Sequence, residues 1–338
     1  MMLQKVNSSL QMLPLLANLL RGAGLLGVAA AGAAAFAWWL GDGQGWLVPL
    51  AAALAAGGAL YGYGGRLVLR LYRAQPVDPR QAPHLWAMVR ELAGLADVAP
   101  PRLFVVEASA ANAFVVGRVS RRAALVVTSG ILRLLDEAEL RAVLAHELAH
   151  VLRGDMLPAT LAAALGGLLA VVSRAGMAVD DQAAADRPGW QSPLWLLLGP
   201  LAAGFARIAG SAGRELAADQ VGARLCGDAP ALASALQRIQ ADGAQLRSFG
   251  LVGRYPAGAQ MMVCDPLGPG GWPQRLFRVH PPLERRLREL RGPGVPASAA
   301  AQRQALERGV DQQAGGAVEQ RAEQRGAEAA DFESGTER

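Results

Sequence analysis

The sequence predicts a mainly α-helical integral membrane protein that also contains a small β-sheet. Three observations carry this prediction: four long apolar segments, two short strand-like runs, and a helical segment that places two histidines one turn apart. The chain has 338 residues, and 52% of them are hydrophobic. That share is higher than in ordinary soluble domains and favours membrane spans.

Four segments are long and apolar enough to cross a membrane as helices: residues 22–40, 43–65, 156–173 and 188–206. Each helical residue adds about 1.5 Å, so about 20 residues cross a ~30 Å hydrocarbon core. The first two form a hairpin around Asp42, with tryptophans near the turn as at a membrane–water interface. The second pair suits a second hairpin, although apolar helices of this length also occur buried in soluble cores.

Charged residues orient these segments. The turns of the two hairpins are acidic, whereas basic residues flank the segments at their other ends: Lys5 and Arg21, then Arg66, Arg70, Arg73 and Arg80, then Arg153, and finally Arg207 and Arg214. Loops rich in Lys and Arg stay in the cytoplasm. We therefore expect a multi-pass protein of a bacterial-type inner (plasma) membrane, with both termini and both polar segments cytoplasmic.

The net charge of +5 comes mostly from these flanking arginines. They form no basic stripe interleaved with aromatic residues, so we expect a lipid bilayer as partner and no nucleic acid. Cys226 and Cys264 are isolated from each other and predict neither a disulfide framework nor a zinc ribbon.

Two short apolar runs, Val115–Val116 and residues 124–127, are separated by arginines and predict paired strands. An exposed edge of such a pair can bind an extended peptide as an added strand. An ordinary sheet edge is the alternative interpretation.

Residues 135–153 predict a helix that carries a metal site. Acidic residues at its start complement the helix dipole, and Gly154 marks its end. His146 and His150 project from one face, and two imidazoles so placed can ligate one zinc ion. Glu147 lies beside them, where it can accept a proton from the attacking water instead of binding the metal.

A catalytic zinc needs a third protein ligand and one open position. Glu215 is the best candidate, in a predicted helix that follows the fourth apolar segment. Asp219 lies one turn further on the same face, where it can hydrogen-bond the far nitrogen of a ligating histidine. A pair of carboxylates on a helix surface is the alternative.

With these residues in place, the chain resembles the HtpX-like membrane metalloproteases, relatives of the eukaryotic CAAX prenyl proteases. Four motifs in the expected order carry the resemblance over about residues 80–290: Asn112-Ala113-Phe114 followed by Gly117; Thr128-Ser129-Gly130 leading to His146-Glu147-Leu148-Ala149-His150; Glu215 with Asp219; and His280-Pro281-Pro282 with Arg286 beyond.

The resemblance implies a gluzincin-type domain, interrupted by a transmembrane hairpin, with one Zn²⁺ per chain. It implies His146, His150 and Glu215 as ligands, Glu147 as general base, and a role in stress response and protein quality control. The long Ala- and Glu-rich tail departs from the usual pattern, without touching the chemistry.

The remaining motif residues allow two interpretations each. His280 either stabilises the oxyanion of the reaction or caps a turn before the predicted helix 283–290. Arg286 either holds a carboxylate near the site or belongs to a solvated face. For Asn112 to Phe114, the resemblance favours contact with substrate.

These elements divide the chain into six parts: an N-terminal cytoplasmic segment (1–21), a first transmembrane hairpin (22–65), a first catalytic part (66–155), a second hairpin (156–206), a second catalytic part (207–290) and a disordered tail (291–338).

The sequence thus predicts a membrane-anchored zinc endopeptidase that cuts misfolded or membrane proteins. A zinc site inside the bilayer is disfavoured, because charges such as Asp136, Glu137 and Arg153 near His146 are costly at that depth. A catalytically silent scaffold or adaptor that keeps zinc for stability is the alternative. Structural zinc usually has four protein ligands, whereas three candidates are present and Glu147 is intact. No feature assigns the substrate or an oligomeric state.

Overall fold

The structure, a computed structural model, describes residues 2–40, 47–175, 194–245, 255–264 and 277–292. Met1–Val295 form one compact unit. The predicted turn at Asp42, the acidic turn of the second hairpin and nearly all of the predicted disordered tail lie outside the described residues.

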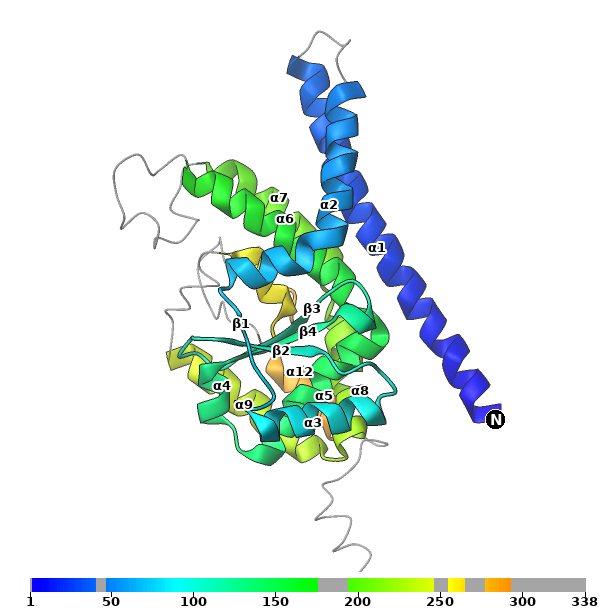
Figure 1. Ribbon diagram of the computed structural model, residues 1–338, viewed down its shortest axis with the longest axis vertical. Helices are drawn as coiled ribbons and strands as arrows, with labels where there is room; N and C mark the ends of the chain where they lie inside the picture. The colour runs from blue at the N-terminus through cyan, green and yellow to red at the C-terminus, as the bar shows by residue number, and fades with distance from the viewer. Residues whose placement is uncertain (1, 41–46, 176–193, 246–254, 265–276, 293–338) are drawn as a thin grey trace, which may run out of the picture. The chain divides into compact units, whose positions relative to one another are not determined.

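Two long helices begin the chain, α1 (Met2–Leu40) and α2 (Leu47–Leu71), and they pack against each other (Figure 1). Both are long and apolar enough to cross a membrane, α1 over Pro14–Gly32 and α2 over its whole length. Helix α1 begins well before the first predicted apolar segment. Trp38 and Trp39 are exposed near its end, where tryptophans of a membrane–water interface are expected.

The second predicted hairpin contains α6 (Met156–Ala175) and α7 (Trp195–Ala209), which pack together. Helix α6 is of membrane length, and 72% of its apolar window is buried inside the protein. Helix α7 has 15 residues, about 22 Å. It reaches the length of a span only together with α8 (Ala212–Cys226), from which a bend of 44° separates it.

A four-stranded mixed sheet has the strand order β1-β2-β4-β3. Strands β3 and β4 pair antiparallel, which confirms the predicted strand pair; β2 and β4 run parallel, and β1 and β2 antiparallel. The strands are β1 (Gln75–Pro76), β2 (Arg102–Val106), β3 (Ala113–Val116) and β4 (Ala124–Thr128).

Strands β3 and β4 are buried at every position because both faces of the sheet are covered. Leu125 and Val127 pack into a core with helices from the polar segments. Ala124 and Val126 pack on the other face with α2, α6 and α7. The sheet therefore joins the apolar helices to the helices that hold the site, as Figure 1 shows. The first core uses α3 (Pro83–Leu95), α5 (Glu137–Arg153) and α9 (Ala229–Gln245).

Short elements complete the described fold: the 3-10 helices η1 (Ser120–Arg122) and η4 (Pro256–Met261), and the helices α4 (Ser129–Leu134) and α12 (Leu283–Leu290). Helix α12 has the bounds that the sequence predicted. Cys226 and Cys264 are not joined in a disulfide.

Candidate metal centre

Helix α5 carries the first half of the site, and local sequence fixes both of its ends. The Asp136 carboxylate accepts a hydrogen bond from the Glu139 backbone N–H at 2.9 Å, and the Glu139 carboxylate accepts one from the Asp136 N–H at 3.1 Å. This reciprocal cap starts the helix at Glu137, slightly later than predicted. Gly154 ends it with φ at 70°, a left-handed conformation that glycine adopts without steric cost.

His146, Glu147 and His150 all point into the protein. His146 and Glu147 are completely buried, and His150 is 7% exposed. The two imidazole rings meet edge to face, with 4.9 Å between their centroids. Burying three ionisable side chains together is costly unless they bind one another or a ligand.

Helix α8 approaches His146 closely because Gly222 has no side chain. A Cβ at Gly222 would lie 2.7 Å from the His146 Cα and 2.8 Å from its backbone nitrogen. The Ser211 hydroxyl caps α8 by accepting a hydrogen bond from the Arg214 N–H at 3.3 Å. This packing brings the face of α8 that carries Glu215 against the two histidines.

Three ligand atoms converge on one point. The Glu215 Oε2 lies 3.7 Å from the His146 Nε2 and 3.8 Å from the His150 Nε2. The three residues form a group that could hold a metal ion. Donors bound to zinc at 2.0–2.2 Å in a tetrahedron are about 3.3–3.6 Å apart. The spacing of these atoms therefore fits one ion of that size.

The polar atoms of this cluster lack hydrogen-bond partners among the described residues. They include the His146 Nε2, both carboxylate oxygens of Glu147, the Glu215 Oε2 and the His280 Nδ1. Buried polar atoms in folded proteins are normally paired. A convergence of unpaired acceptors indicates a cation, with a polar molecule beside it, as the native partner of these groups.

Asp219 and Arg286 lie behind His146. The Asp219 Oδ1 is 2.9 Å from the His146 Nδ1, an ion-pair distance, although the angle is poor for a hydrogen bond. Arg286 donates two hydrogen bonds to Asp219, from Nε at 2.7 Å and from Nη2 at 2.6 Å. It also donates to the Val263 carbonyl. The structure thus places Arg286 in the interior against a carboxylate, and not on a solvated face.

Sequence reasoning missed several polar groups around the site. The Asp155 Oδ2 lies 3.2 Å from the His150 Nδ1, and its Oδ1 accepts a hydrogen bond of 2.7 Å from the Asn18 amide. Arg214 is buried and donates to the Glu215 Oε1 at 3.5 Å. The available signal for Asp155 was its position five residues after His150, just beyond the helix end, from which a carboxylate can reach back.

Carboxylates around the histidines control their protonation. Burial lowers the pKa of His150, but Glu215 and Asp155 outweigh it and raise the pKa to about 10. Burial likewise opposes a charge on His146, yet its carboxylate neighbours raise its pKa too. Burial raises the pKa of Glu147 above its ordinary value, a direction that suits a proton acceptor working near neutral pH.

His280 also reaches the cluster, from the chain just before α12. Its Nδ1 lies 3.7 Å from the Glu215 Oε2, and its Nε2 lies 3.0 Å from the Ala259 carbonyl oxygen. A carbonyl only accepts hydrogen bonds, so Nε2 carries a proton. The ring therefore presents Nδ1 to the site.

Asn112 to Phe114 lie at one end of the β3 edge, and the chain's own residues cover them. The Asn112 amide donates to the Cys264 carbonyl at 3.3 Å, and its Oδ1 accepts from the Val263 N–H at 3.0 Å. Ala113 accepts from the same N–H, and Phe114 forms a bridge with Met262. Residues 262–264 thus pair with the predicted substrate position.

Further along that edge, the Thr160 hydroxyl bonds to both the N–H and the C=O of Gly117. Alternate residues of a strand present backbone groups to the same edge, so Val115 faces the edge between the two covered ends. Val115 lines a small pocket with His150 and Asp155.

The chain combines a buried group of two histidines and a glutamate that could hold a metal ion with helices long enough to cross a membrane. These two features define the class of membrane metallopeptidases. The chain belongs to peptidase family M48, whose model matches residues 79–293. A protease HtpX homologue of Methylibium petroleiphilum is 40% identical over 279 residues, which cover 81% of this chain and 96% of that protein.

A protease HtpX homologue of Burkholderia thailandensis is 39% identical over 255 residues, 74% of this chain and 88% of that protein. Among solved structures, Saccharomyces mikatae Ste24p aligns with a TM-score of 0.41 and 15% identity, over 86% of this chain and 67% of that one. The sequence relatives and the family model confirm the resemblance drawn from the four motifs.

Proposed function

We propose that this protein is a zinc endopeptidase in which His146, His150 and Glu215 hold one Zn²⁺ and Glu147 is the general base. One observation supports it above the others. The Nε2 atoms of both histidines lie 3.7 and 3.8 Å from one carboxylate oxygen, and Glu147 lies beside them with both oxygens unpaired among the described residues.

A bound zinc ion supplies Lewis-acid activation of water and of the peptide carbonyl. Glu147 takes a proton from the attacking water and delivers it to the leaving amine. Asp219 and Asp155 face the Nδ1 atoms of the two histidines. They hold the proton on Nδ1, so that Nε2 stays available as a ligand.

His280 is proposed to stabilise the developing oxyanion. Its Nε2 proton is directed to the Ala259 carbonyl, so Nδ1 donates to the oxyanion only when the ring carries both protons.

Substrates are proposed to be misfolded or membrane proteins, bound as an added strand along β3. Ala113, within the predicted segment Asn112 to Phe114, and then Val115 supply the backbone groups. Residues 262–264 cover the part of this edge that precedes Val115. They must move aside for a substrate that extends from Val115 towards Ala113.

The proposed topology places both catalytic parts, residues 66–155 and 207–290, and both termini in the cytoplasm of an inner membrane. The arginines around the apolar segments support it. Reporter fusions after Arg73 and Arg291 should be cytoplasmic, and one at Asp181 external. An external reporter at Arg291 would mean an odd number of spans.

The general base is tested with Glu147→Gln, assayed for zinc content and for cleavage of an unfolded protein in detergent. We expect one zinc per chain, and hydrolysis lowered by about 10² to 10⁴-fold. Undiminished hydrolysis would remove Glu147 from the mechanism. If the wild type binds zinc but cleaves no protein, the alternative, a zinc-containing scaffold or adaptor, becomes the better description.

A further inference from the structure

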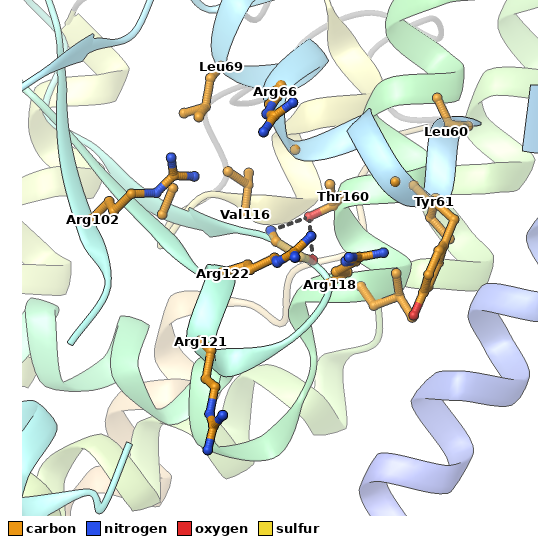
Figure 2. Close-up of a pocket in the computed structure, with 16 residues that line it drawn as sticks. Leu60, Tyr61, Arg66, Leu69, Arg102, Val116, Arg118, Arg121, Arg122 and Thr160 are labelled. Atoms are coloured by element: carbon orange, nitrogen blue, oxygen red, sulfur yellow. Dashed lines mark hydrogen bonds between the residues drawn. The ribbon is translucent and has the colours of Figure 1, made fainter. Parts of the chain in front are cut away.

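A second pocket lies away from the metal centre, where the apolar helices meet the sheet (Figure 2). It has a volume of about 410 Å³ and is lined by residues of α2 and α6, the start of β2, and the connection from β3 to β4. The Thr160 hydroxyl ties α6 to this connection, because it accepts from the Gly117 N–H at 2.9 Å and donates to the Gly117 carbonyl at 3.2 Å. The pocket wall is thus cross-linked by hydrogen bonds.

Arginine dominates the lining. None of the 16 lining residues is Asp or Glu. Five of them are arginines: Arg66, Arg102, Arg118, Arg121 and Arg122. Figure 2 shows the guanidinium groups of Arg66, Arg118 and Arg122 around Thr160, whereas Arg121 points away from them. In the described part of the chain, no carboxylate forms an ion pair with any of the five. The positive charges of these arginines repel one another, and a bound anion would offset that repulsion.

The pocket lies at the level where apolar helices give way to the polar domain. Arg66 is near the end of the candidate span Leu47–Leu71, and Thr160 near the start of Met156–Ser173. Lipid phosphates lie just outside the hydrocarbon core, at this same level. Tyr61, whose ring lies 5.1 Å from the Arg118 guanidinium carbon, belongs to a residue type enriched there.

We propose that this pocket binds the phosphate headgroup of an anionic phospholipid of the cytoplasmic leaflet. The planar guanidinium group matches phosphate oxygens with two parallel hydrogen bonds. Basic pockets between membrane helices on the cytoplasmic side are suited to such headgroups. The lining residues Leu60 and Tyr61, the latter 40% exposed, provide an apolar surface for the first part of the acyl chains.

The test uses the full chain in zwitterionic micelles and compares three probes: dioctanoyl phosphatidylglycerol, dioctanoyl phosphatidylcholine and glycerol 3-phosphate. Binding is measured by native mass spectrometry and by the shift in Tm. The pocket variant carries Arg66→Gln, Arg118→Gln and Arg122→Gln. Its matched control carries Arg90→Gln, Arg133→Gln and Arg224→Gln, which remove the same charge from exposed arginines elsewhere.

We expect the pocket variant to bind phosphatidylglycerol at least about 10-fold more weakly, because charge-assisted hydrogen bonds are lost, and the control variant to bind it as the wild type does. Equal weakening in both variants would mean general attraction by net charge and overturn the proposal. If glycerol 3-phosphate binds as tightly as the lipid, the pocket is a site for a soluble phosphate compound, and the proposal of a lipid ligand is overturned.

A second measurement does not depend on the folding of any variant. A phosphatidylglycerol carrying a photoreactive group in its headgroup is cross-linked to the wild-type protein in a phosphatidylcholine bilayer, and the labelled peptides are mapped. Labelling of residues 60–69 or 116–124, competed by unlabelled phosphatidylglycerol, supports the proposal. Labelling confined to other segments contradicts it.

Discussion

Asn18 in helix α1 and Asp155 beyond the end of helix α5 are joined by a hydrogen bond of 2.7 Å, across 137 positions of the sequence. The Asn18 amide also donates to the Arg153 carbonyl at 3.3 Å. Because Asp155 lies 3.2 Å from the Nδ1 of His150, a helix of membrane length is connected through one carboxylate to a candidate metal ligand.

Replacing Asn18 by alanine should therefore weaken zinc binding while the fold persists. The Asp155 carboxylate would lose its partner and hold the His150 ring less firmly. Losses of such outer partners cost about 10- to 100-fold in metal affinity or activity. Competition with a chelator measures the affinity, and Leu19→Ala, at an exposed position of the same helix, is the control. Unchanged affinity and activity in Asn18→Ala would show that the contact does not act on the site.

Glu215 and Asp219 should respond differently to substitution. Glu215→Ala is expected to abolish stoichiometric zinc, because a ligand is lost. Asp219→Asn keeps the shape and should retain zinc with about 10- to 100-fold weaker affinity. The asparagine change also avoids leaving Arg286 buried without a partner. Zinc content and dissociation rate after purification distinguish the two. Zinc binding by Glu215→Ala with wild-type affinity would remove Glu215 from the ligand set.

The close approach of α8 to α5 predicts a strong effect at one glycine. Gly222→Ala places a methyl group 2.7 Å from the His146 Cα, so the helices must separate. We expect the protein to lose about 1–3 kcal/mol of stability, as for other overpacked positions, together with zinc affinity. Gly213→Ala in the same helix, where a Cβ meets nothing within 4 Å, is the control. It should be neutral or stabilising by up to about 1 kcal/mol. Equal Tm values for the two variants would contradict this packing.

Zinc affinity should rise with pH. In the metal-free protein the carboxylates raise the pKa of His150 to about 10 and that of His146 above its ordinary value. At pH 7 the His150 ring binds a proton that the metal must displace, so a lower pH strengthens the competition from protons. Affinity should change by about 10-fold per pH unit for each proton released. Calorimetric titrations at pH 7 in buffers of different ionisation enthalpy count these protons. Affinity that is constant between pH 6 and 8 would contradict the raised pKa values.

The elements that local signals define were predictable from the sequence. The end of α5 at Gly154 and helix α12 depend on residues within a few positions of one another. The start of α5 was predicted at residue 135, two residues before its observed start at Glu137. The strand pair was predictable because β3 and β4 are adjacent in sequence.

Contacts between distant segments were not predictable in this way. No local pattern indicates that Asn18 meets Asp155, or that residues 262–264 pair with the β3 edge. The arginines near residue 66 predicted only an orientation in the membrane, and those near residue 118 only marked the break between two strands. The pocket forms only when α2, α6 and the sheet are assembled.

The sheet is buried on both faces and connects the helices that carry the candidate metal site to the apolar helices. Excising the polar segments as a soluble enzyme would expose Phe114, Val116 and Val126 to water, because much of the core around them comes from α2, α6 and α7. Such a fragment should aggregate through the stripped face of the sheet. A water-soluble descendant of this protein would need new side chains on that face of the sheet, whereas the residues proposed to bind zinc could stay as they are.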